Sequence, residues 1–205
     1  FVPKSSYDGE SFARSIIKSV VSKQKKFVEL VFPMVKSKKL LKTYWLKAAK
    51  KIAGEISKKK EVAFVTIGDP FIYSTYIYLL ETLRENFQNI EVETIPGITS
   101  FNAASCSVGI PLAKGNEKFA VIPVTRDMNS VQKILKEKEF DTVVLMKIGS
   151  KLNEVIKILI DMKLVKSSVL ISHVGCPNEK VIHNISSIQD KKLGYLSVII
   201  VRCKI

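Results

Sequence analysis

Gly68-Asp69-Pro70-Phe71-Ile72-Tyr73-Ser74-Thr75 is the first of two glycine-bearing turns that decide the fold of this chain. The second is Pro96-Gly97-Ile98-Thr99-Ser100-Phe101-Asn102-Ala103-Ala104. A short apolar run precedes each turn, and a stretch with helical spacing of apolar residues follows it. This repeated order predicts neighbouring parallel strands, and an open α/β sheet builds its ligand site where such strands end.

The first half of the chain alternates between strand-like and helix-like patterns. Apolar residues recur at helical spacing in four stretches, residues 8–22, 37–58, 72–87 and 99–108. Short apolar runs predict three strands, at residues 27–32, 62–67 and 90–95. Such an alternation of strands and helices favours a mostly parallel sheet.

The second half contains more strands and fewer helices. Strands are predicted at residues 119–124, 142–147, 168–173, 181–185 and 196–202, and helices at 130–138 and 150–162. The late strands follow one another with little helix between them, which predicts an antiparallel portion. Two glycines and a proline at residues 109–116 mark a linker. We therefore predict two α/β domains, residues 1–112 with a mostly parallel sheet and residues 117–205 with a mixed sheet.

The composition excludes several classes of protein. Apolar residues make up 46% of the 205 residues, which supports a real core. No apolar run approaches the roughly 20 residues of a membrane span. The three cysteines lack close spacing and fit the reduced thiols of a cytoplasmic protein better than disulfides. The two histidines, His173 and His183, have no metal-ligand spacing, so no metal site is expected.

Lysine dominates the net charge of +14, which comes from 33 basic and 19 acidic residues. A solvated lysine-rich surface is the simplest explanation, and attraction of a polyanionic substrate is the functional alternative. Nucleic-acid readers usually use arginine forks with interleaved aromatic residues. Since only Arg14, Arg84, Arg126 and Arg202 are arginines, we expect neither nucleic acid nor a membrane as a partner.

The first turn can serve either structure or binding. Gly68 permits a sharp turn of the backbone and has no Cβ that would exclude a ligand. Pro70 suits the first turn of the next helix, and Asp69 can cap that helix through a side-chain oxygen. The functional alternative is that bare backbone groups face a ligand in a cleft, with the hydroxyls of Ser74 and Thr75 one turn later.

The second turn leaves the same two alternatives open. Thr99 fits an N-cap and Ser100 a first-turn residue, so helix capping alone can explain both. The small residues Asn102, Ala103 and Ala104 allow close packing against the helix. Each motif by itself is therefore compatible with a purely structural role.

Taken together, the two motifs are far more specific. Followed by Gly109-Ile110-Pro111-Leu112-Ala113, they resemble the tetrapyrrole methylase family over essentially the whole chain. Val31-Phe32-Pro33-Met34, Val144-Leu145-Met146-Lys147 and Tyr195-Leu196-Ser197 extend the resemblance. Within the family, the pattern is most similar to the branch that methylates C20 of precorrin-2 or cobalt-factor II in cobalamin biosynthesis. The family begins with a strand and a glycine-rich loop, and we expect these to be absent or to lie outside this sequence.

The resemblance implies two α/β domains with a cofactor cleft between them, a homodimer, and a small-molecule tetrapyrrole substrate. S-adenosyl-L-methionine would be the methyl donor in that cleft. Carried over to this sequence, the family's cofactor contacts fall on Gly68, Asp69, Pro70, Ser74, Thr75, Thr99, Ser100, Met146, Gly175, Tyr195 and Ser197. Asp69 and Tyr73 are candidates for a catalytic base.

Three other functions remain open from the sequence. A methylase of the same superfamily could act at a different tetrapyrrole carbon or in diphthine synthesis. A non-enzymatic module could bind a ligand or nucleic acid through the basic surface, and a metal chelatase is a third alternative. The sequence also leaves open whether the substrate carries cobalt.

Overall fold

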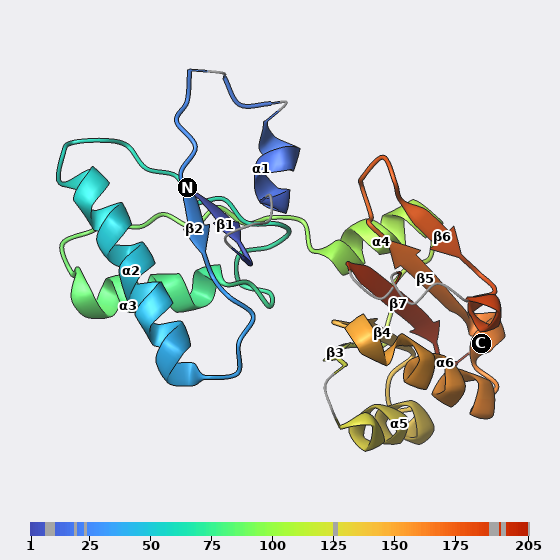
Figure 1. Cartoon of the computed structure of the whole chain (residues 1–205). Helices are drawn as coiled ribbons and strands as arrows, with labels where there is room; N and C mark the ends of the chain where they lie inside the picture. Colours follow the sequence, from blue (N-terminus) through green and yellow to red (C-terminus); the bar gives the residue numbers. More distant parts are fainter. Residues whose placement is uncertain are drawn as a thin grey trace. The chain divides into compact units, whose positions relative to one another are not determined.

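The computed structural model describes residues 1–6, 11–18, 20–22, 24–124, 127–188, 193 and 196–204. The chain divides into two compact units, Phe1–Ile98 and Thr99–Ile205 (Figure 1). This division by packing falls before the linker that the sequence suggests at residues 109–116, because the helix at 100–108 packs with the second unit. The α/β class predicted from the sequence is confirmed.

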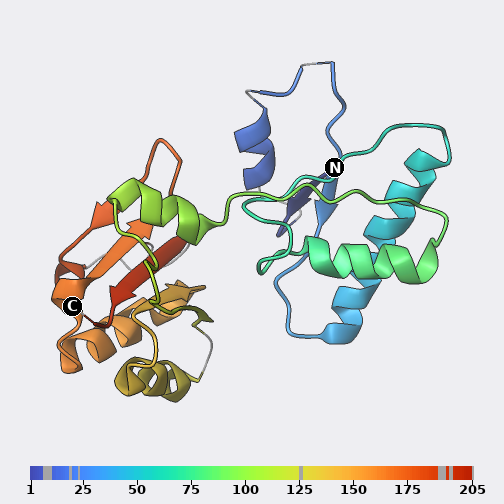
Figure 2. The ribbon, with the colours of Figure 1, turned by 180° about the vertical axis from the view of Figure 1, so that it is seen from behind.

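The first unit is built on a parallel pair of short strands, β1 (Val2–Lys4) and β2 (Glu29–Val31). Its helices are α1 (Phe12–Ile17), α2 (Lys38–Ile56) and α3 (Tyr76–Asn86). The helices α2 and α3 lie side by side (Figure 2). Together with β2 they bury one apolar cluster, made of Leu30, Phe32, Ala48, Ala49, Ile52, Leu79 and Leu83.

Local chemistry explains why α2 is the longest helix among the described residues. The Ser37 hydroxyl accepts a hydrogen bond from the Leu40 amide (3.3 Å), which caps the first turn. Ala48, Ala49 and Ile52 recur at helical spacing and are buried, whereas most of the lysines lie on exposed positions. The prediction of a helix over 37–58 is confirmed almost to the residue.

Two predicted strands of the first unit are wrong. Residues 62–66 and 90–95 are extended, but neither segment is part of a sheet. The first makes backbone hydrogen bonds to Phe1, from the Phe1 amine to Ala63 O (2.6 Å) and from Val65 N to Phe1 O (3.0 Å). Both segments line a cavity of about 730 Å³. The sheet of this unit is parallel as predicted, although among the described residues it consists of β1 and β2 alone.

The second unit contains a five-stranded mixed sheet in the order β3-β4-β7-β5-β6. Its strands are β3 (Phe119–Pro123), β4 (Thr142–Met146), β5 (Ser168–Ser172), β6 (Lys180–Ile182) and β7 (Ser197–Arg202). The strands β3 and β4 are parallel, and β7 runs antiparallel to both β4 and β5. The strand β6 is antiparallel to β5. The predicted antiparallel portion is confirmed.

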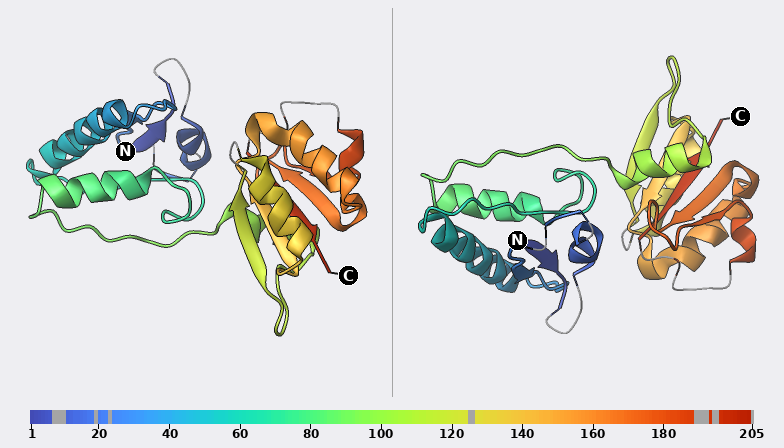
Figure 3. Two further views of the ribbon diagram at one scale, coloured as in Figure 1. Left: turned by 90° about the horizontal axis from the view of Figure 1, so that it is seen from below. Right: turned by 90° about the horizontal axis from the view of Figure 1, so that it is seen from above.

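Helices cover both faces of this sheet (Figure 3). The helix α4 (Ser100–Val108) packs on one face through Phe101 and Ala104. The helices α5 (Met128–Glu137) and α6 (Leu152–Asp161) pack on the other face. Successive side chains of β4 point to opposite faces of the sheet. Val143 and Leu145 therefore pack on the α5–α6 side, and Val144 packs on the α4 side.

Short 3₁₀ turns complete the second unit at Gly149–Lys151, Val165–Ser167 and Ile185–Ser187. The helix predicted over 8–22 is shorter in the structure, where α1 ends at Ile17, and residues 8–10 and 19 lie outside the described residues. Within the described part of the chain, no helix is both long and apolar enough to span a membrane.

Candidate functional site

The Asp69 carboxylate joins the two glycine-bearing turns of the first unit. Its Oδ1 accepts a hydrogen bond from the Phe71 amide (2.9 Å), which closes the first turn. Its Oδ2 accepts one from the Gly97 amide (3.1 Å), which belongs to the second turn. Charge-assisted hydrogen bonds of this kind are stronger than neutral ones. A single side chain therefore fixes both turns relative to each other.

Gly97 and Gly68 pack so closely that a side chain at Gly97 would not fit. A Cβ built at Gly97 would lie 2.4 Å from the carbonyl oxygen of Gly68 and 3.4 Å from Cα of Asp69. Gly68 itself has a φ of 73°, in the left-handed region that favours glycine. The cavity of about 730 Å³ in this unit is lined by both turns, through Gly68, Pro70, Pro96 and Gly97. Bare backbone of both motifs therefore borders one concave surface.

The helix after the first turn begins later than the sequence predicts. Since α3 starts at Tyr76, neither Asp69 nor Pro70 lies in its first turn, and the predicted cap by Asp69 is wrong. Ser74 replaces it, because its Oγ accepts a hydrogen bond from the Tyr76 amide (3.1 Å). The same hydroxyl lies 3.0 Å from Thr66 Oγ1. Thr75 is the N-cap residue of α3 but makes no capping bond with its side chain.

Around this turn, a buried hydroxyl contrasts with exposed apolar side chains. Ser74 is only 8% exposed, so its hydroxyl supports the turn. Tyr73 is 44% exposed and has a φ of 54°, which is unusual for a residue with a side chain. Phe71 and Ile72 are also exposed, at 52% and 41%. The first turn thus presents an exposed apolar rim, made of Phe71, Ile72 and Tyr73, beside its backbone, and apolar side chains of this kind are common at the sites that bind small organic ligands.

The second turn leads into α4 as the sequence predicts. Thr99 Oγ1 accepts a hydrogen bond from the Asn102 amide (3.3 Å), so Thr99 is the N-cap and Ser100 the first helical residue. Ala104 is fully buried in the cluster on the sheet, which explains why a small residue is needed there. The N-terminal amides of α4 remain suited to contact with a ligand's acceptor groups.

In the second unit, three predicted contact positions share one edge of the sheet. Met146 is the last residue of β4, and Gly175 follows the end of β5. Because β7 is antiparallel to both strands, its first residue, Ser197, pairs with Ser172 at the end of β5. Ser197 is buried and donates its hydroxyl hydrogen to Leu193 O. Tyr195, the remaining predicted contact, lies outside the described residues.

The backbone at this edge is strained at several places. Lys147, His173 and Leu196 all have positive φ, at 54°, 54° and 52°, although none is glycine. Gly175 also has a positive φ, of 74°. Such conformations are unfavourable for residues with a Cβ, and they cluster at ligand sites. This feature could not be predicted from the sequence, because no pattern of residue types marks the three strained positions.

His173 is a polar residue of this edge that sequence reasoning did not select. Its amide donates to Leu196 O (3.0 Å), and its ring Nδ1 lies 2.8 Å from Ser172 Oγ. Since Ser172 is fully buried, this contact fixes the imidazole next to the strand end. No motif in the sequence distinguishes His173 from a histidine of the core, and only the strand register reveals its position.

Comparisons with known proteins agree with this arrangement. The family model described as Tetrapyrrole (Corrin/Porphyrin) Methylases matches residues 6–189. The chain is 40% identical over 159 residues to a "Probable cobalt-precorrin-2 C(20)-methyltransferase" of Methanocaldococcus jannaschii, an alignment that covers 78% of this chain and 64% of the relative. It is 27% identical over 202 residues to the "Cobalt-precorrin-2 C(20)-methyltransferase" of Salmonella typhimurium, covering 98% of this chain and 83% of the relative.

Among solved structures, the fold is similar to a uroporphyrin-III C-methyl transferase from Thermus thermophilus complexed with S-adenyl homocysteine. The TM-score is 0.53 at 15% identity, and the match covers 84% of this chain and 75% of that one. At this identity the likeness concerns the fold alone. Of the two relatives compared by sequence, the chain spans a little under two thirds of the Methanocaldococcus jannaschii protein and most of the Salmonella typhimurium protein.

Proposed function

Because the chain belongs to the tetrapyrrole methylase family, we propose that it methylates C20 of precorrin-2 or cobalt-factor II in cobalamin biosynthesis. The observation that carries the proposal is the 40% identity to a relative named for this reaction, over 159 residues. In this proposal the methyl donor is S-adenosyl-L-methionine, as membership of the tetrapyrrole methylase family implies.

The residues present fit such a donor. Two glycine-bearing turns offer bare backbone on a concave surface, and adenosyl and amino-acid groups are well matched by amides and carbonyls. In this proposal, Gly68, Asp69 and Pro70 contact the donor from the first turn. Thr99 and Ser100 do so at the start of α4, and Met146, Gly175 and Ser197 at the sheet edge. Ser74, Thr75 and Tyr195 complete the proposed set.

When bound, the donor supplies an electrophilic sulfonium methyl group. The chain's own part is to hold that methyl group in line with the ring carbon and to exclude water. Both Asp69 oxygens already accept amide hydrogen bonds, so this carboxylate supports the turns rather than proton transfer. Tyr73, exposed on the rim of the first turn, is the better of the two candidates for handling the displaced proton.

The assembly that follows from the proposal is a cytoplasmic homodimer. The domain division proposed from the sequence, residues 1–112 and 117–205, differs from the packing units in that α4 packs with the second unit. Support comes from the family resemblance and from three free cysteines, Cys106, Cys176 and Cys203. Size-exclusion chromatography with light scattering would measure the mass of the particle, and a monomer at micromolar concentration would contradict the dimer.

Mass spectrometry of a turnover assay tests the reaction. The purified chain is incubated with S-adenosyl-L-methionine and with either precorrin-2 or its cobalt-bearing counterpart. A gain of one methyl group on one of the two rings is the expected result, and mapping of the product by NMR should place it at C20. Methylation at another carbon would identify a different methylase of the superfamily. Cofactor binding without methylation of either ring would indicate that the substrate is a different molecule, for example the diphthine precursor.

A further inference from the structure

The loop between β5 and β6 is closed by hydrogen bonds within itself. The Cys176 amide donates to His173 O (3.0 Å), and the Glu179 amide donates to Cys176 O (2.9 Å). Gly175 has a φ of 74° and lies exposed at the outer bend. The loop therefore presents the Gly175 backbone at the sheet edge that also holds Met146 and Ser197.

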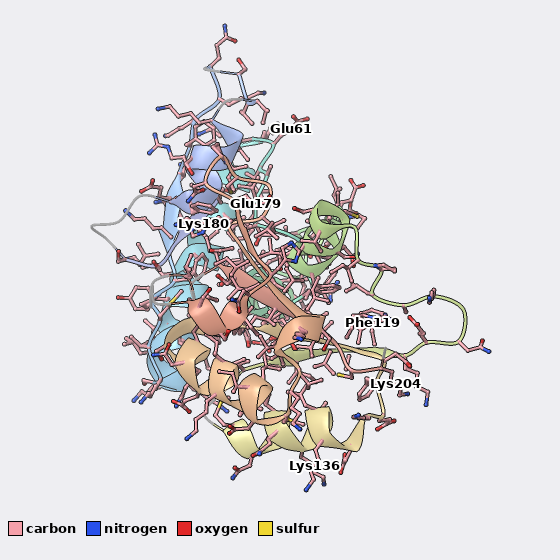
Figure 4. All side chains as sticks on the ribbon, turned by 90° about the vertical axis from the view of Figure 1, so that its right-hand side faces the viewer. Glu61, Phe119, Lys136, Glu179, Lys180 and Lys204 are labelled. Carbon is pink, nitrogen blue, oxygen red and sulfur yellow. The ribbon has the colours of Figure 1, made fainter. Side chains whose placement is uncertain are left out.

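One carboxylate joins this loop to a distant helix. Glu179 Oε2 accepts a hydrogen bond from the Gly175 amide (2.7 Å). Its Oε1 accepts the hydroxyl hydrogen of Ser107, which lies on α4 and is 72 residues away in sequence. Glu179 is labelled in Figure 4 at the start of β6, next to Lys180. A single side chain thus holds both the bend of the loop and the C-terminal half of α4.

We propose that Glu179 is a positioning residue for the methyl donor, because it fixes the Gly175 loop against α4. The inference rests on the proposed function, in which both Gly175 and the start of α4 contact the donor. Rotation of the Gly175 peptide would change which backbone groups the loop presents, and the hydrogen bond to Glu179 prevents that rotation. Glu179 touches no reacting group and acts only through its hydrogen bonds to Gly175 and Ser107.

The environment of the side chain supports this role. Hydrogen bonds from Ser107 first, and from Gly175 second, lower the pKa of Glu179 below its ordinary value. The carboxylate is therefore charged at neutral pH and accepts both bonds at once. Glu179 also lies outside the apolar clusters of the second unit, so its replacement removes no core packing.

Two substitutions at Glu179 distinguish the loss of its hydrogen bonds from the loss of its side-chain volume. Glu179→Ala removes both acceptors, and we expect the Kd for S-adenosyl-L-homocysteine, measured by calorimetry, to rise about ten-fold. Glu179→Gln keeps an acceptor for Gly175 and offers an amide donor to the Ser107 oxygen, so its Kd should stay within about three-fold of the parent value. Ser107→Ala removes one of the two hydrogen bonds, so its Kd should lie between those of Glu179→Ala and Glu179→Gln. Lys180→Ala changes the neighbouring exposed residue and should have no effect.

Kinetics and hydrogen exchange complete the test. The KM for the donor should rise in Glu179→Ala while kcat at saturating donor stays unchanged, since the reacting groups are intact. Amide exchange at Gly175 should accelerate in Glu179→Ala and not in Glu179→Gln. If the parent protein binds the donor and Glu179→Ala, Glu179→Gln and Ser107→Ala bind it with the same affinity as the parent, the positioning role of Glu179 is overturned while the proposed function stands. A parent protein that binds no donor would overturn the proposed function and this inference with it. If Glu179→Ala fails to fold, Ser107→Ala decides, and an unchanged Kd for it overturns the proposal.

Discussion

Asp69 and Gly97 are 28 residues apart in sequence and are joined by a hydrogen bond of 3.1 Å from the Gly97 amide to Asp69 Oδ2. Together with the bond from the Phe71 amide to Oδ1, it makes one carboxylate the link between two turns. The turns therefore form as a pair, which gives a physical reason why they are informative together and ambiguous alone.

Replacing Asp69 tests this link directly. Asp69→Ala leaves two amides without their acceptor, and removing charge-assisted hydrogen bonds costs about 1.5–3 kcal/mol. We expect the free energy of unfolding to fall by that amount and the affinity for S-adenosyl-L-methionine to weaken, as urea denaturation and calorimetry would measure. Asp69→Asn keeps one acceptor oxygen and should lose less of both. A folded Asp69→Ala protein with unchanged donor affinity would contradict the proposed role of this turn.

A Gly97→Ala substitution should distort both turns. The new Cβ would lie 2.4 Å from Gly68 O, a backbone atom that cannot swing away like a side chain. Overpacking of this kind costs about 1–3 kcal/mol, and thermal unfolding should show the loss together with weaker donor binding.

Gly54→Ala is the matched control for Gly97→Ala. Gly54 lies within α2, and a Cβ there would meet nothing within 4 Å. Alanine is favoured over glycine inside a helix by about 0.5–1 kcal/mol, so this variant should be slightly stabilised. If both variants had the same melting temperature, the close approach at Gly97 would not matter.

The sequence predicted best what short-range chemistry determines. The helix over 37–58 and the N-cap at Thr99 are correct, because a capping hydroxyl and apolar spacing act within a few residues. The strands β3, β4, β5 and β7 are also correct, since the buried runs of β4, β5 and β7 find partners on both sides, whereas the strand predicted at 181–185 ends at Ile182. Here local pattern and tertiary pairing agree.

The failures have equally specific causes. The apolar runs at 62–67 and 90–95 indicate burial, but a strand also needs a hydrogen-bonded neighbour in a sheet, and neither run has one in the structure. The predicted cap at Asp69 is wrong because α3 begins only at Tyr76, and the two Asp69 oxygens instead accept the amides of Phe71 and Gly97. The positive φ at Lys147, His173 and Leu196 arises from tertiary constraint, which no local pattern encodes.

Arg202 ties β7 to the segment before β3. Its Nη1 and Nη2 donate to the two oxygens of Glu117 at 3.0 and 2.9 Å, and Nη1 also donates to Thr142 Oγ1 (2.8 Å). Lysine keeps the charge but not the fork, so Arg202→Lys should lower the melting temperature by a few degrees at neutral pH.

The effect of Arg202→Lys should depend on pH with a defined sign. The hydrogen bond from Arg202 is the main cause that lowers the pKa of Glu117. A carboxyl whose pKa is lowered on folding stabilises above its unfolded pKa and loses that effect as pH falls. The difference in melting temperature between parent and Arg202→Lys should therefore shrink below about pH 4. A difference independent of pH would assign the loss to packing of the arginine stem instead.

Glu55 offers a second titration with a clear expected value. Hydrogen bonds from Lys60 first and Lys58 second lower the pKa of Glu55 to about 2. NMR titration of the side-chain carboxyl should show its midpoint far below the ordinary range. Lys60→Met should raise the midpoint more than Lys58→Met does. Equal midpoints in both variants would contradict this order of causes.

The salt dependence of kcat/KM should show whether the excess of lysines attracts the substrate. The family's tetrapyrrole substrates carry many carboxylates, and a net charge of +14 would attract them over distances that ions screen. The screening length falls from about 10 Å at 0.1 M to about 3 Å at 1 M, so kcat/KM for the tetrapyrrole should fall as salt rises. The KM for the methyl donor, which is not a polyanion, is the matched control and should change little. A flat kcat/KM across this range would show that the lysines only solvate the surface, and a parallel change in both constants would indicate a general effect of salt on the protein.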